Sequence, residues 1–289
     1  MTLTLVKAWT AAKDRLKDAG IDQPSIDARL MLEVAAGVTR TEIVTDPYRE
    51  LTAEQVATLN DYLDRRAKRE PVSHIIGRKG FWKILLQVNK NVLTPRPETE
   101  VIVDEVLKAF PEAMPFSMLD LGVGSGTILL AVLAERPAAK GLGVDASDEA
   151  LAVARDNAAN LNLDGRAALL RGDWTAGLGD ASFDLVVSNP PYIPTAVIET
   201  LEPEVRDHEP RLALDGGADG LDAYRLLAPE ILRVLKPAGM FAVEIGHDQS
   251  QAVEALFRDA GAREVRTVKD LSTYDRVVVG VKNPLETGA

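Results

Sequence analysis

The fold of this chain of 289 residues is decided by one glycine-rich stretch, Leu119-Asp120-Leu121-Gly122-Val123-Gly124-Ser125-Gly126-Thr127. Its first residues are apolar enough for a buried strand, and a helix is expected directly after it, over residues 126–135. Glycines let the backbone turn tightly between the two elements and bring its N–H groups close to a ligand. The stretch therefore predicts a ligand site at the carboxyl edge of a parallel sheet.

On both sides of this stretch, apolar strands alternate with helices. Near-continuous apolar runs are typical of buried parallel strands, and they predict strands at 117–122, 140–145, 167–172, 183–188 and 239–245. Helices are expected at 98–109, 126–135, 148–162, 220–235 and 248–260. Two further strands, 264–268 and 276–281, follow each other too closely for a helical crossover, so they are expected to pair antiparallel. The pattern predicts an α/β fold with a doubly wound, seven-stranded, Rossmann-like sheet.

The N-terminal part has a different pattern. From residue 3 to about 70, apolar side chains recur at helical spacing, as in the series Leu5, Trp9, Ala12 and Leu16. The expected helix boundaries are a stop at Gly20, an N-cap at Ser25, and capping boxes at Thr39-x-x-Glu42 and Thr52-x-x-Gln55. This part is expected to form a small helical bundle.

Between residues 80 and 94 the pattern becomes strand-like. Apolar residues dominate 81–88, Asn89-Lys90-Asn91 comes next, and Val92-Leu93 resumes the run, which indicates a β-hairpin closed by an asparagine-rich turn. We therefore expect a helical domain over residues 1–75, a hairpin connector over 76–95 and an α/β domain over 96–289, with an irregular end at 286–289.

Composition narrows the possible function classes. The chain has no cysteine, which excludes disulfides, thiolate metal sites and cysteine nucleophiles. No apolar run approaches the roughly 18 residues of a membrane span, and no signal peptide is recognisable, so a cytoplasmic protein is expected. Residues 1–80 hold 13 Lys and Arg against 12 Asp and Glu, whereas the rest holds 20 against 32. Because Lys and Arg supply most non-specific nucleic-acid affinity, free DNA or RNA is a disfavoured partner.

The strand ends indicate a nucleoside cofactor. Asp145 ends the second strand, 23 residues beyond Gly122, where a carboxylate can accept hydrogen bonds from both ribose hydroxyls. The glycine spacing differs from the G-x-G-x-x-G of dinucleotide sites, and no Lys-Ser/Thr follows as in a P-loop. S-adenosylmethionine fits better, because its methionine part needs only close approach of the backbone. Asp173 would face the adenine amino group, and Trp174 would cover the ring.

The fourth strand ends in a possible reaction site, Ser188-Asn189-Pro190-Pro191-Tyr192. Consecutive prolines fix φ near −65° and remove two N–H donors, so the carbonyl groups of this turn are held as acceptors. The Asn189 side-chain oxygen and the Pro190 carbonyl could accept both hydrogens of an NH2 group and aim its weakly nucleophilic nitrogen at a methyl carbon. Tyr192 would stack on the planar substrate. Alignment would replace activation by a strong base.

These residues resemble a known family. Asn189-Pro190-Pro191-Tyr192 is similar to the signature of methyltransferases acting on adenine N6, cytosine N4 or glutamine N5. The remaining similarities favour the HemK/PrmC family, the peptide chain release factor N5-glutamine methyltransferases, and they lie in Glu70-Pro71-Val72, Gly80-Phe81-Trp82, Arg96-Pro97-Glu98-Thr99-Glu100, Glu202-Pro203-Glu204-Val205-Arg206 and Glu209-Pro210-Arg211-Leu212-Ala213-Leu214-Asp215-Gly216-Gly217. The resemblance runs from about residue 25 to 282, and therefore covers both parts of the chain.

The resemblance implies a methyl transfer from S-adenosylmethionine, with S-adenosylhomocysteine as product, to the glutamine of a Gly-Gly-Gln motif in class I release factors. It also implies that the N-terminal bundle helps to dock the release factor. Together with the reasoning above, it gives Asn189, Pro190 and Tyr192 as catalytic residues, with Pro191 as a further substrate contact. The expected cofactor contacts are Gly122, Val123, Gly124, Ser125, Gly126, Asp145, Asp173, Trp174 and Asn189.

Several other residues have less specific patterns. Arg96 and Glu98 flank Pro97 at a helix start, where residues of these types more often cap and pair at the surface, and a place in the pocket lining is the alternative. His208 is expected in a solvated loop, and no metal site is predicted. The basic run at 65–69 is expected to be a solvated face at a helix end, where cations complement the helix dipole, and release-factor docking is the alternative. Alternative functions are an N6-adenine nucleic-acid methyltransferase, a ribosomal-protein glutamine methyltransferase and a non-catalytic nucleoside-binding module.

Overall fold

The structure is a computed structural model, and it describes residues 3–284. The chain divides into two compact units. A helical unit consists of residues 1–78 and 202–208, and a sheet unit consists of residues 79–201 and 209–289. Within the described residues, no helix combines the length and the apolar character that a membrane span requires. The irregular end expected at 286–289 lies outside the described residues.

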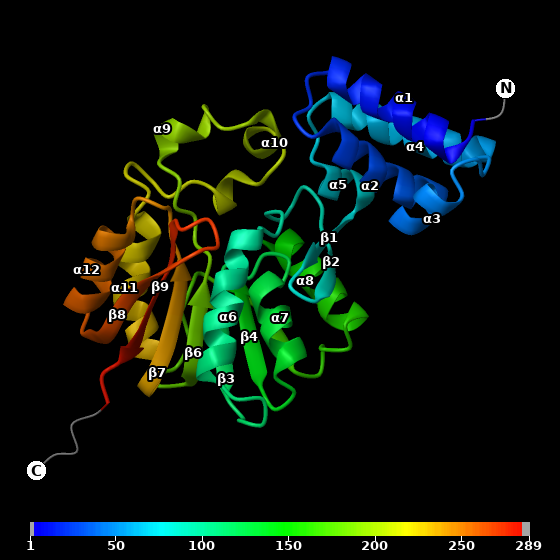
Figure 1. Cartoon of the computed structure of the whole chain (residues 1–289). Coiled ribbons are helices and arrows are strands. Elements are labelled where there is room, and N and C mark those ends of the chain that lie inside the picture. The colour runs from blue at the N-terminus through cyan, green and yellow to red at the C-terminus, as the bar shows by residue number, and fades with distance from the viewer. Residues whose placement is uncertain (1–2, 285–289) are drawn as a thin grey trace, which may run out of the picture. The chain divides into compact units, whose positions relative to one another are not determined.

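The helical unit contains α1 (Leu5–Asp18), α2 (Pro24–Ala36), α3 (Arg40–Thr45), α4 (Ala53–Ala67), α5 (Val72–Ile76) and the short α10 (Pro203–Arg206) (Figure 1). Both capping boxes are confirmed, at Thr39 and at Thr52. The expected N-cap at Ser25 is wrong, because Gln23 takes that position and Pro24 starts the helix. The fixed φ of proline suits the first position of a helix, so the cap lies two residues earlier than expected.

The basic run at 65–69 is only partly the solvated face that was expected, because Lys68 is exposed but Arg66 is buried. Arg66 is 7% exposed, and its guanidinium donates from Nε to Asp27 Oδ2 at 2.8 Å and from Nη1 to Glu204 Oε1 at 2.9 Å. Arg69 also pairs with Glu204, at 3.3 Å. Because two carboxylates compensate its charge, Arg66 can be buried, and its pairing fixes residues 202–208 within the helical unit.

The sheet unit is built on seven strands in the order β5-β4-β3-β6-β7-β9-β8. The strands are β3 (Ser117–Leu121), β4 (Lys140–Asp145), β5 (Ala167–Arg171), β6 (Phe183–Ser188), β7 (Leu235–Glu244), β8 (Ala262–Lys269) and β9 (Asp275–Lys282). β3 to β7 pair in parallel, whereas β9 runs antiparallel to both β7 and β8. The seven-stranded α/β fold and its antiparallel end are therefore confirmed.

Helices cover both faces of this sheet (Figure 1). One core joins α6 (Glu100–Ala109), α7 (Thr127–Glu135) and α8 (Asp148–Asn160) to the sheet, and the other joins α11 (Asp222–Val234) and α12 (Ser250–Asp259) to it. Successive strand residues alternate between the cores, as Met118 and Leu119 do in β3. The strand order reverses at β3 and β6, and ligands of such sheets bind at the carboxyl ends next to the reversal.

The hairpin is present, but its predicted turn is wrong. β1 (Arg78–Phe81) pairs with β2 (Ile84–Gln87), so the chain reverses at Trp82 rather than at the asparagine-rich segment. Trp82 has a positive φ of 52°, and its backbone N–H donates to Glu100 Oε1 at 2.7 Å while its indole N–H donates to Glu135 Oε1 at 3.0 Å. Contacts with α6 and α7 therefore stabilise a turn that local sequence does not favour.

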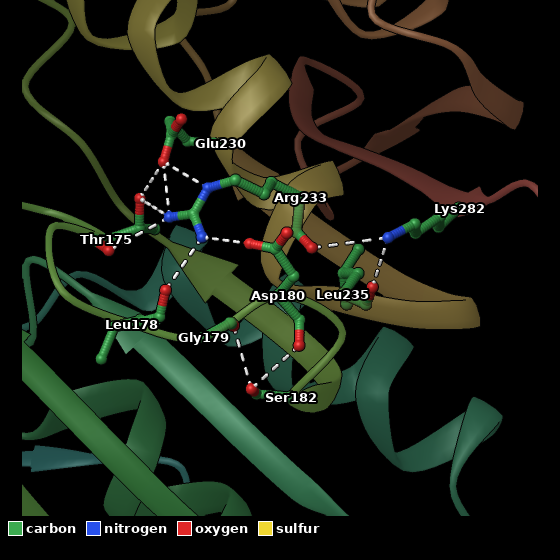
Figure 2. Close-up of polar contacts among 9 residues, drawn as sticks. All are labelled: Thr175, Leu178, Gly179, Asp180, Ser182, Glu230, Arg233, Leu235 and Lys282. Carbon is green, nitrogen blue, oxygen red and sulfur yellow. Dashed lines mark hydrogen bonds and ion pairs between the residues drawn. The ribbon is translucent and has the colours of Figure 1, made fainter.

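Figure 2 shows a network of polar contacts among the end of α11, the loop before β6 and Lys282 of β9. Arg233, in the last turn of α11, donates to Glu230 Oε2 at 2.8 Å, to Asp180 Oδ1 at 2.7 Å and to the Thr175 carbonyl at 3.2 Å. Lys282 of β9 donates to the Leu235 carbonyl at 2.7 Å. The network joins the end of α11 to the loop that precedes β6.

Candidate active site

Three glycines shape the loop that leaves β3. Gly122, Gly124 and Gly126 have φ values of 73°, 54° and 85°, in a region that L side chains rarely adopt. A Cβ at Gly126 would also lie 2.7 Å from Leu130 Cδ1 in α7. The loop therefore depends on glycine for its conformation at three positions, and also for space at Gly126.

Asp145, at the end of β4, holds this loop in position. Its Oδ2 accepts the N–H of Gly124 at 2.9 Å, and its Oδ1 accepts the N–H of Ser147 at 2.9 Å. Each oxygen keeps a second lone pair, so Asp145 can still accept hydrogen bonds from a ligand. The half-buried Trp174 lies beside the same loop, since a Cβ at Gly122 would be 3.7 Å from its ring. Its positive φ of 50° is unusual for an aromatic residue.

The diproline corner, residues 189–192, begins where β6 ends. Ser188, the last residue of β6, donates from Oγ to the Leu121 carbonyl at 2.7 Å and so joins the ends of β6 and β3. At the other end of the corner, Gln249 Nε2 donates to the Tyr192 carbonyl at 3.0 Å. A Cβ at Gly220 would collide with that same carbonyl oxygen. The corner is therefore held from both ends, next to the glycine loop.

The polar side chains of the corner share one buried carboxylate. Asn189 Nδ2 donates to Thr99 Oγ1 at 3.4 Å, and Thr99 Oγ1 donates to Glu244 Oε2 at 2.6 Å. The Tyr192 hydroxyl donates to Glu244 Oε1 at 3.3 Å. Because Nδ2 of Asn189 is used in this way, Oδ1 is the atom available to accept from a substrate. Neither Thr99 nor Glu244 lies in a sequence pattern that indicates this role.

Burial dominates the acid–base properties of this group. It raises the pKa of Glu244 to about 7, although the hydrogen bond from Thr99 and the charge of Arg276 act in the opposite direction. Burial also raises the pKa of Tyr192 well above its ordinary value, and the negative charge of Glu244 adds to that effect. Tyr192 therefore stays protonated and remains a hydrogen-bond donor.

Asp120 is a second buried carboxyl group, and it lines the cavity of the site. Its Oδ2 accepts the N–H of Leu129 at 3.0 Å, whereas its Oδ1 has no hydrogen-bond partner among the described residues. Burial raises its pKa to about 7, and the nearby charge of Asp145 adds to this effect. An unpaired carboxylate oxygen suits a positively charged ligand group, so this residue fits the sulfonium or ammonium of S-adenosylmethionine.

Arg96 does not pair at the surface as expected. It lines the cavity, and its Nη2 donates to Glu209 Oε2 at 2.7 Å. Burial raises the pKa of Glu209, whose side chain is 1% exposed, while the charge of Arg96 acts against this rise. The segment that starts at Glu209 forms a wall of the cavity, and this arrangement supplies Arg96 with a buried partner. Glu98 lies close enough to Glu244 for its charge to raise the pKa of that carboxyl.

The cavity has a volume of about 690 Å³, which is within the range of small-molecule sites. The predicted residues that line it are Gly122, Val123, Gly124, Ser125, Asp145, Asp173, Trp174, Asn189 and Pro191. Gly126, Pro190 and Tyr192 are not part of its lining. The loop 90–96 and the segment 210–213 line it as well. The local sequence of neither segment predicts a place in the cavity lining. Parts of both segments belong to the stretches that resemble the family.

Comparisons with known proteins agree along the whole chain. Residues 7–77 match the family model of the PrmC N-terminal domain, and residues 99–202 match that of the methyltransferase small domain. A release factor glutamine methyltransferase from Caulobacter vibrioides is 89% identical over 289 residues, which is 100% of both chains. Another, from Rhodospirillum rubrum, is 46% identical over 265 residues, or 92% of this chain and 81% of its own length.

Among solved structures, a methyltransferase from Pyrococcus furiosus is similar with a TM-score of 0.51 and 18% identity, over 68% of this chain and 88% of the other. That likeness concerns the fold and agrees with the doubly wound sheet. The identity to full-length relatives extends over the helical unit as well as the sheet unit. The resemblance noted in the sequence is confirmed, and the chain belongs to the family of release factor glutamine methyltransferases.

Proposed function

We propose that this methyltransferase transfers a methyl group from S-adenosylmethionine to the side-chain amide nitrogen, N5, of the glutamine in the Gly-Gly-Gln motif of class I peptide chain release factors, and so modulates translation termination. The observation that carries the proposal is the orientation of Asn189. Its Nδ2 is directed to Thr99, so its Oδ1 can accept an amide hydrogen at the edge of the cavity. Family membership supports the reaction class.

The residues of the cavity suit the cofactor. When bound, S-adenosylmethionine supplies a methyl group on a positively charged sulfonium, and S-adenosylhomocysteine is the product. The glycine loop 122–126 would lie along its methionine part, and Asp120 would complement the positive charge with its unpaired oxygen. Asp145 would accept hydrogen bonds from the ribose hydroxyls, and Asp173 would face the adenine amino group. Trp174 would cover the adenine ring.

The diproline corner would align the substrate amide. Asn189 Oδ1 and the Pro190 carbonyl would accept the two N–H hydrogens, which aims the nitrogen lone pair at the methyl carbon. Such alignment can contribute about 7 to 11 kcal/mol in favourable cases. As the N–C bond forms and the C–S bond breaks, the amide nitrogen becomes strongly acidic and loses one proton to water. Tyr192 and Pro191 would hold the plane of the amide.

A protein substrate also agrees with the charge of the chain. Residues 81–289 hold 32 Asp and Glu against 20 Lys and Arg, which disfavours binding of a phosphate backbone. The helical unit, whose residues match the PrmC N-terminal domain, would help to dock the release factor. A reaction on release factors would take place in the cytoplasm, where they act on ribosomes.

The test is transfer of labelled methyl groups from S-adenosylmethionine, with the purified chain and four acceptors in parallel. The acceptors are a class I release factor, the same factor with the motif glutamine changed to alanine, a ribosomal protein and DNA. Label should enter the first acceptor alone, and mass spectrometry should locate one methyl group on the motif glutamine. Label in the ribosomal protein or in DNA alone would establish one of the alternative functions instead.

A further inference from the structure

The side chain of Asn189 could present either its oxygen or its NH2 group to the substrate. The two orientations have nearly the same shape, so hydrogen-bond partners decide between them. Only the orientation with Oδ1 toward the glutamine can accept an amide hydrogen, because the opposite orientation would place two donors against each other. A group that fixes this choice would therefore control methyl transfer without touching the reacting atoms.

The polarity of the buried hydrogen bonds identifies such a group. An ionised carboxylate only accepts hydrogen bonds, so Thr99 must donate its single hydroxyl hydrogen to Glu244 Oε2, at 2.6 Å. The oxygen of Thr99 is then left as an acceptor on the side of Asn189, and Nδ2 approaches it at 3.4 Å. Hydrogen bonds of active sites are often long in the absence of substrate and shorten when it binds.

We propose that Glu244 is a positioning residue for methyl transfer, which acts through Thr99 to keep Asn189 Oδ1 toward the glutamine and through the Tyr192 hydroxyl to hold the ring of Tyr192. This inference rests on the proposed function. Glu244 is 1% exposed, at the end of β7, and it is not part of the cavity lining. Its effect is therefore transmitted by the side chains that contact it.

The ionisation of Glu244 depends on groups from three neighbouring segments, which are β9, residues 97–99 and the diproline corner. Arg276 of β9 lowers its pKa, whereas Glu98 of the short helix η1 (Pro97–Thr99) raises it. The Tyr192 hydroxyl donates to its carboxylate, and the Tyr224 hydroxyl of α11 donates to its backbone carbonyl at 2.7 Å. With burial as the largest effect, the pKa is about 7.

Protonation of this carboxyl would reverse the polarity of the chain of hydrogen bonds. A protonated Glu244 can donate to Thr99, whose hydroxyl can then donate to Asn189 Oδ1 and turn Nδ2 toward the substrate. Transfer is therefore expected to proceed above about pH 7 and to fall as the pH is lowered through the pKa of Glu244. Asp120 has a similar pKa, so the acid limb assigned to Glu244 is the one that Glu244→Gln removes, and a role of Glu244 in packing alone would leave the limb unchanged in that variant.

The experiment compares Thr99→Val, Thr99→Ser and Glu244→Gln with the wild type, by kcat and KM for the release factor between pH 5.5 and 9. S-adenosylmethionine affinity by calorimetry and a thermal unfolding curve check each variant. The matched control is Glu105→Gln, because Glu105 is a buried carboxylate of α6 that pairs with Arg266 and Lys108 and lies outside the cavity lining.

We expect Thr99→Val to lower kcat at least tenfold at pH 8 with cofactor affinity within twofold, and Thr99→Ser to restore kcat to within threefold. Glu244→Gln should lose the acid limb, and Glu105→Gln should keep it. The inference is overturned by wild-type kcat in Thr99→Val, by equal losses in the valine and serine variants, or by an unchanged acid limb in Glu244→Gln. Absence of wild-type transfer to release factors would instead overturn the proposed function.

Discussion

Charged side chains at the two edges of the seven-stranded sheet differ in their hydrogen-bond partners and in the direction of their pKa shifts. At the amino edge, Asp184 accepts hydrogen bonds from the N–H and the hydroxyl of Ser117, both at 2.8 Å, and from Lys236 at 2.8 Å. Burial acts to raise the pKa of Asp184, but these partners lower it overall. Arg233 is likewise surrounded by oxygen acceptors (Figure 2).

At the carboxyl edge, charged groups are buried with fewer partners. Asp120 and Glu244 both have pKa values raised to about 7, chiefly by burial, and Asp120 Oδ1 has no partner among the described residues. Trp174 keeps a backbone conformation that is uncommon for its type. The amino edge is thus arranged for stability, whereas the carboxyl edge keeps groups that a ligand can satisfy. Substitutions at the two edges should therefore have separable effects.

The largest difference in kcat is expected between Asn189→Ala and a substitution at the amino edge. Loss of the amide acceptor should lower kcat by about 100- to 1,000-fold, as for removal of one donor from an oxyanion hole. Cofactor affinity, measured by calorimetry, should change little. Ser182→Ala is the control, because the hydrogen bonds that Ser182 Oγ donates within the described residues go to the Gly179 and Asp180 carbonyls, outside the cavity lining. Undiminished turnover of Asn189→Ala would refute the alignment mechanism.

At pH 7, Asp120→Asn should raise the free energy of unfolding, whereas Asp184→Asn should lower it. Folded Asp120 holds its proton up to about pH 7, whereas its ordinary pKa is 3.8, so the contribution of Asp120 to the free energy of unfolding falls between about pH 4 and 7. Asp120→Asn escapes this loss and should gain a few kcal/mol relative to wild type by pH 7, since one pKa unit is about 1.4 kcal/mol.

The stability that Asp184 contributes is present above its ordinary pKa and is lost only as the pH falls through its lowered folded value. Asp184→Asn should therefore be destabilised at pH 7, and its deficit should shrink only in acid. Urea unfolding at several pH values measures both effects. A destabilised Asp120→Asn at pH 7 would contradict the contrast between the edges.

Alanine substitutions of Gly126 and Gly177 test the same difference between the edges through cofactor affinity and thermal stability. Gly126 and Gly177 have φ values of 85° and 78°, so alanine at either position costs about 1 to 2 kcal/mol of backbone strain. Only at Gly126 does a Cβ meet a neighbour, Leu130 Cδ1 at 2.7 Å, whereas none lies within 4 Å at Gly177. Gly126→Ala should therefore weaken S-adenosylmethionine binding by about tenfold, and Gly177→Ala should lower the melting temperature without changing that affinity. Equal cofactor affinities would show that the loop tolerates a side chain.

The smallest effect on activity is expected for Arg233→Ala. It removes several hydrogen bonds of the network in Figure 2, and the partly exposed site should lose about 1 to 2 kcal/mol of unfolding free energy. Values of kcat and cofactor affinity should stay at the wild-type level, because none of the residues drawn in Figure 2 lines the cavity. A kcat reduced as much as by Asn189→Ala would mean that the edges are coupled.

Much of the fold follows from local patterns. The apolar runs place β3 to β6 within one residue of their observed ends, and the boxes at Thr39 and Thr52 begin α3 and α4. Such features depend on a few neighbouring residues, so the sequence contains them directly. The hairpin turn was misplaced because its stability comes from Glu100 and Glu135, which belong to helices further along the chain.

Local patterns also gave no indication of two ion pairs with a buried member, Arg66 with Glu204 and the half-exposed Arg96 with the buried Glu209. Arg66 belongs to a run of basic residues that is typical of a solvated helix end. Arg96 precedes a helix start, a position that favours pairing at the surface. Their acidic partners, Glu204 and Glu209, are more than 100 positions away in the chain. A charged residue can be buried only where such a partner is brought to it, and no local pattern indicates where that occurs.

For the site, the glycine spacing, the strand ends and the Asn-Pro-Pro-Tyr corner could all be recognised from the amino-acid sequence, because each is a short segment whose chemistry depends on its own residues. The connection of Asn189 through Thr99 to Glu244 could not. These contacts join residues 90 and 145 positions apart. They exist because β7 pairs beside β6 and brings Glu244 to the corner, and that strand order is a property of the folded sheet.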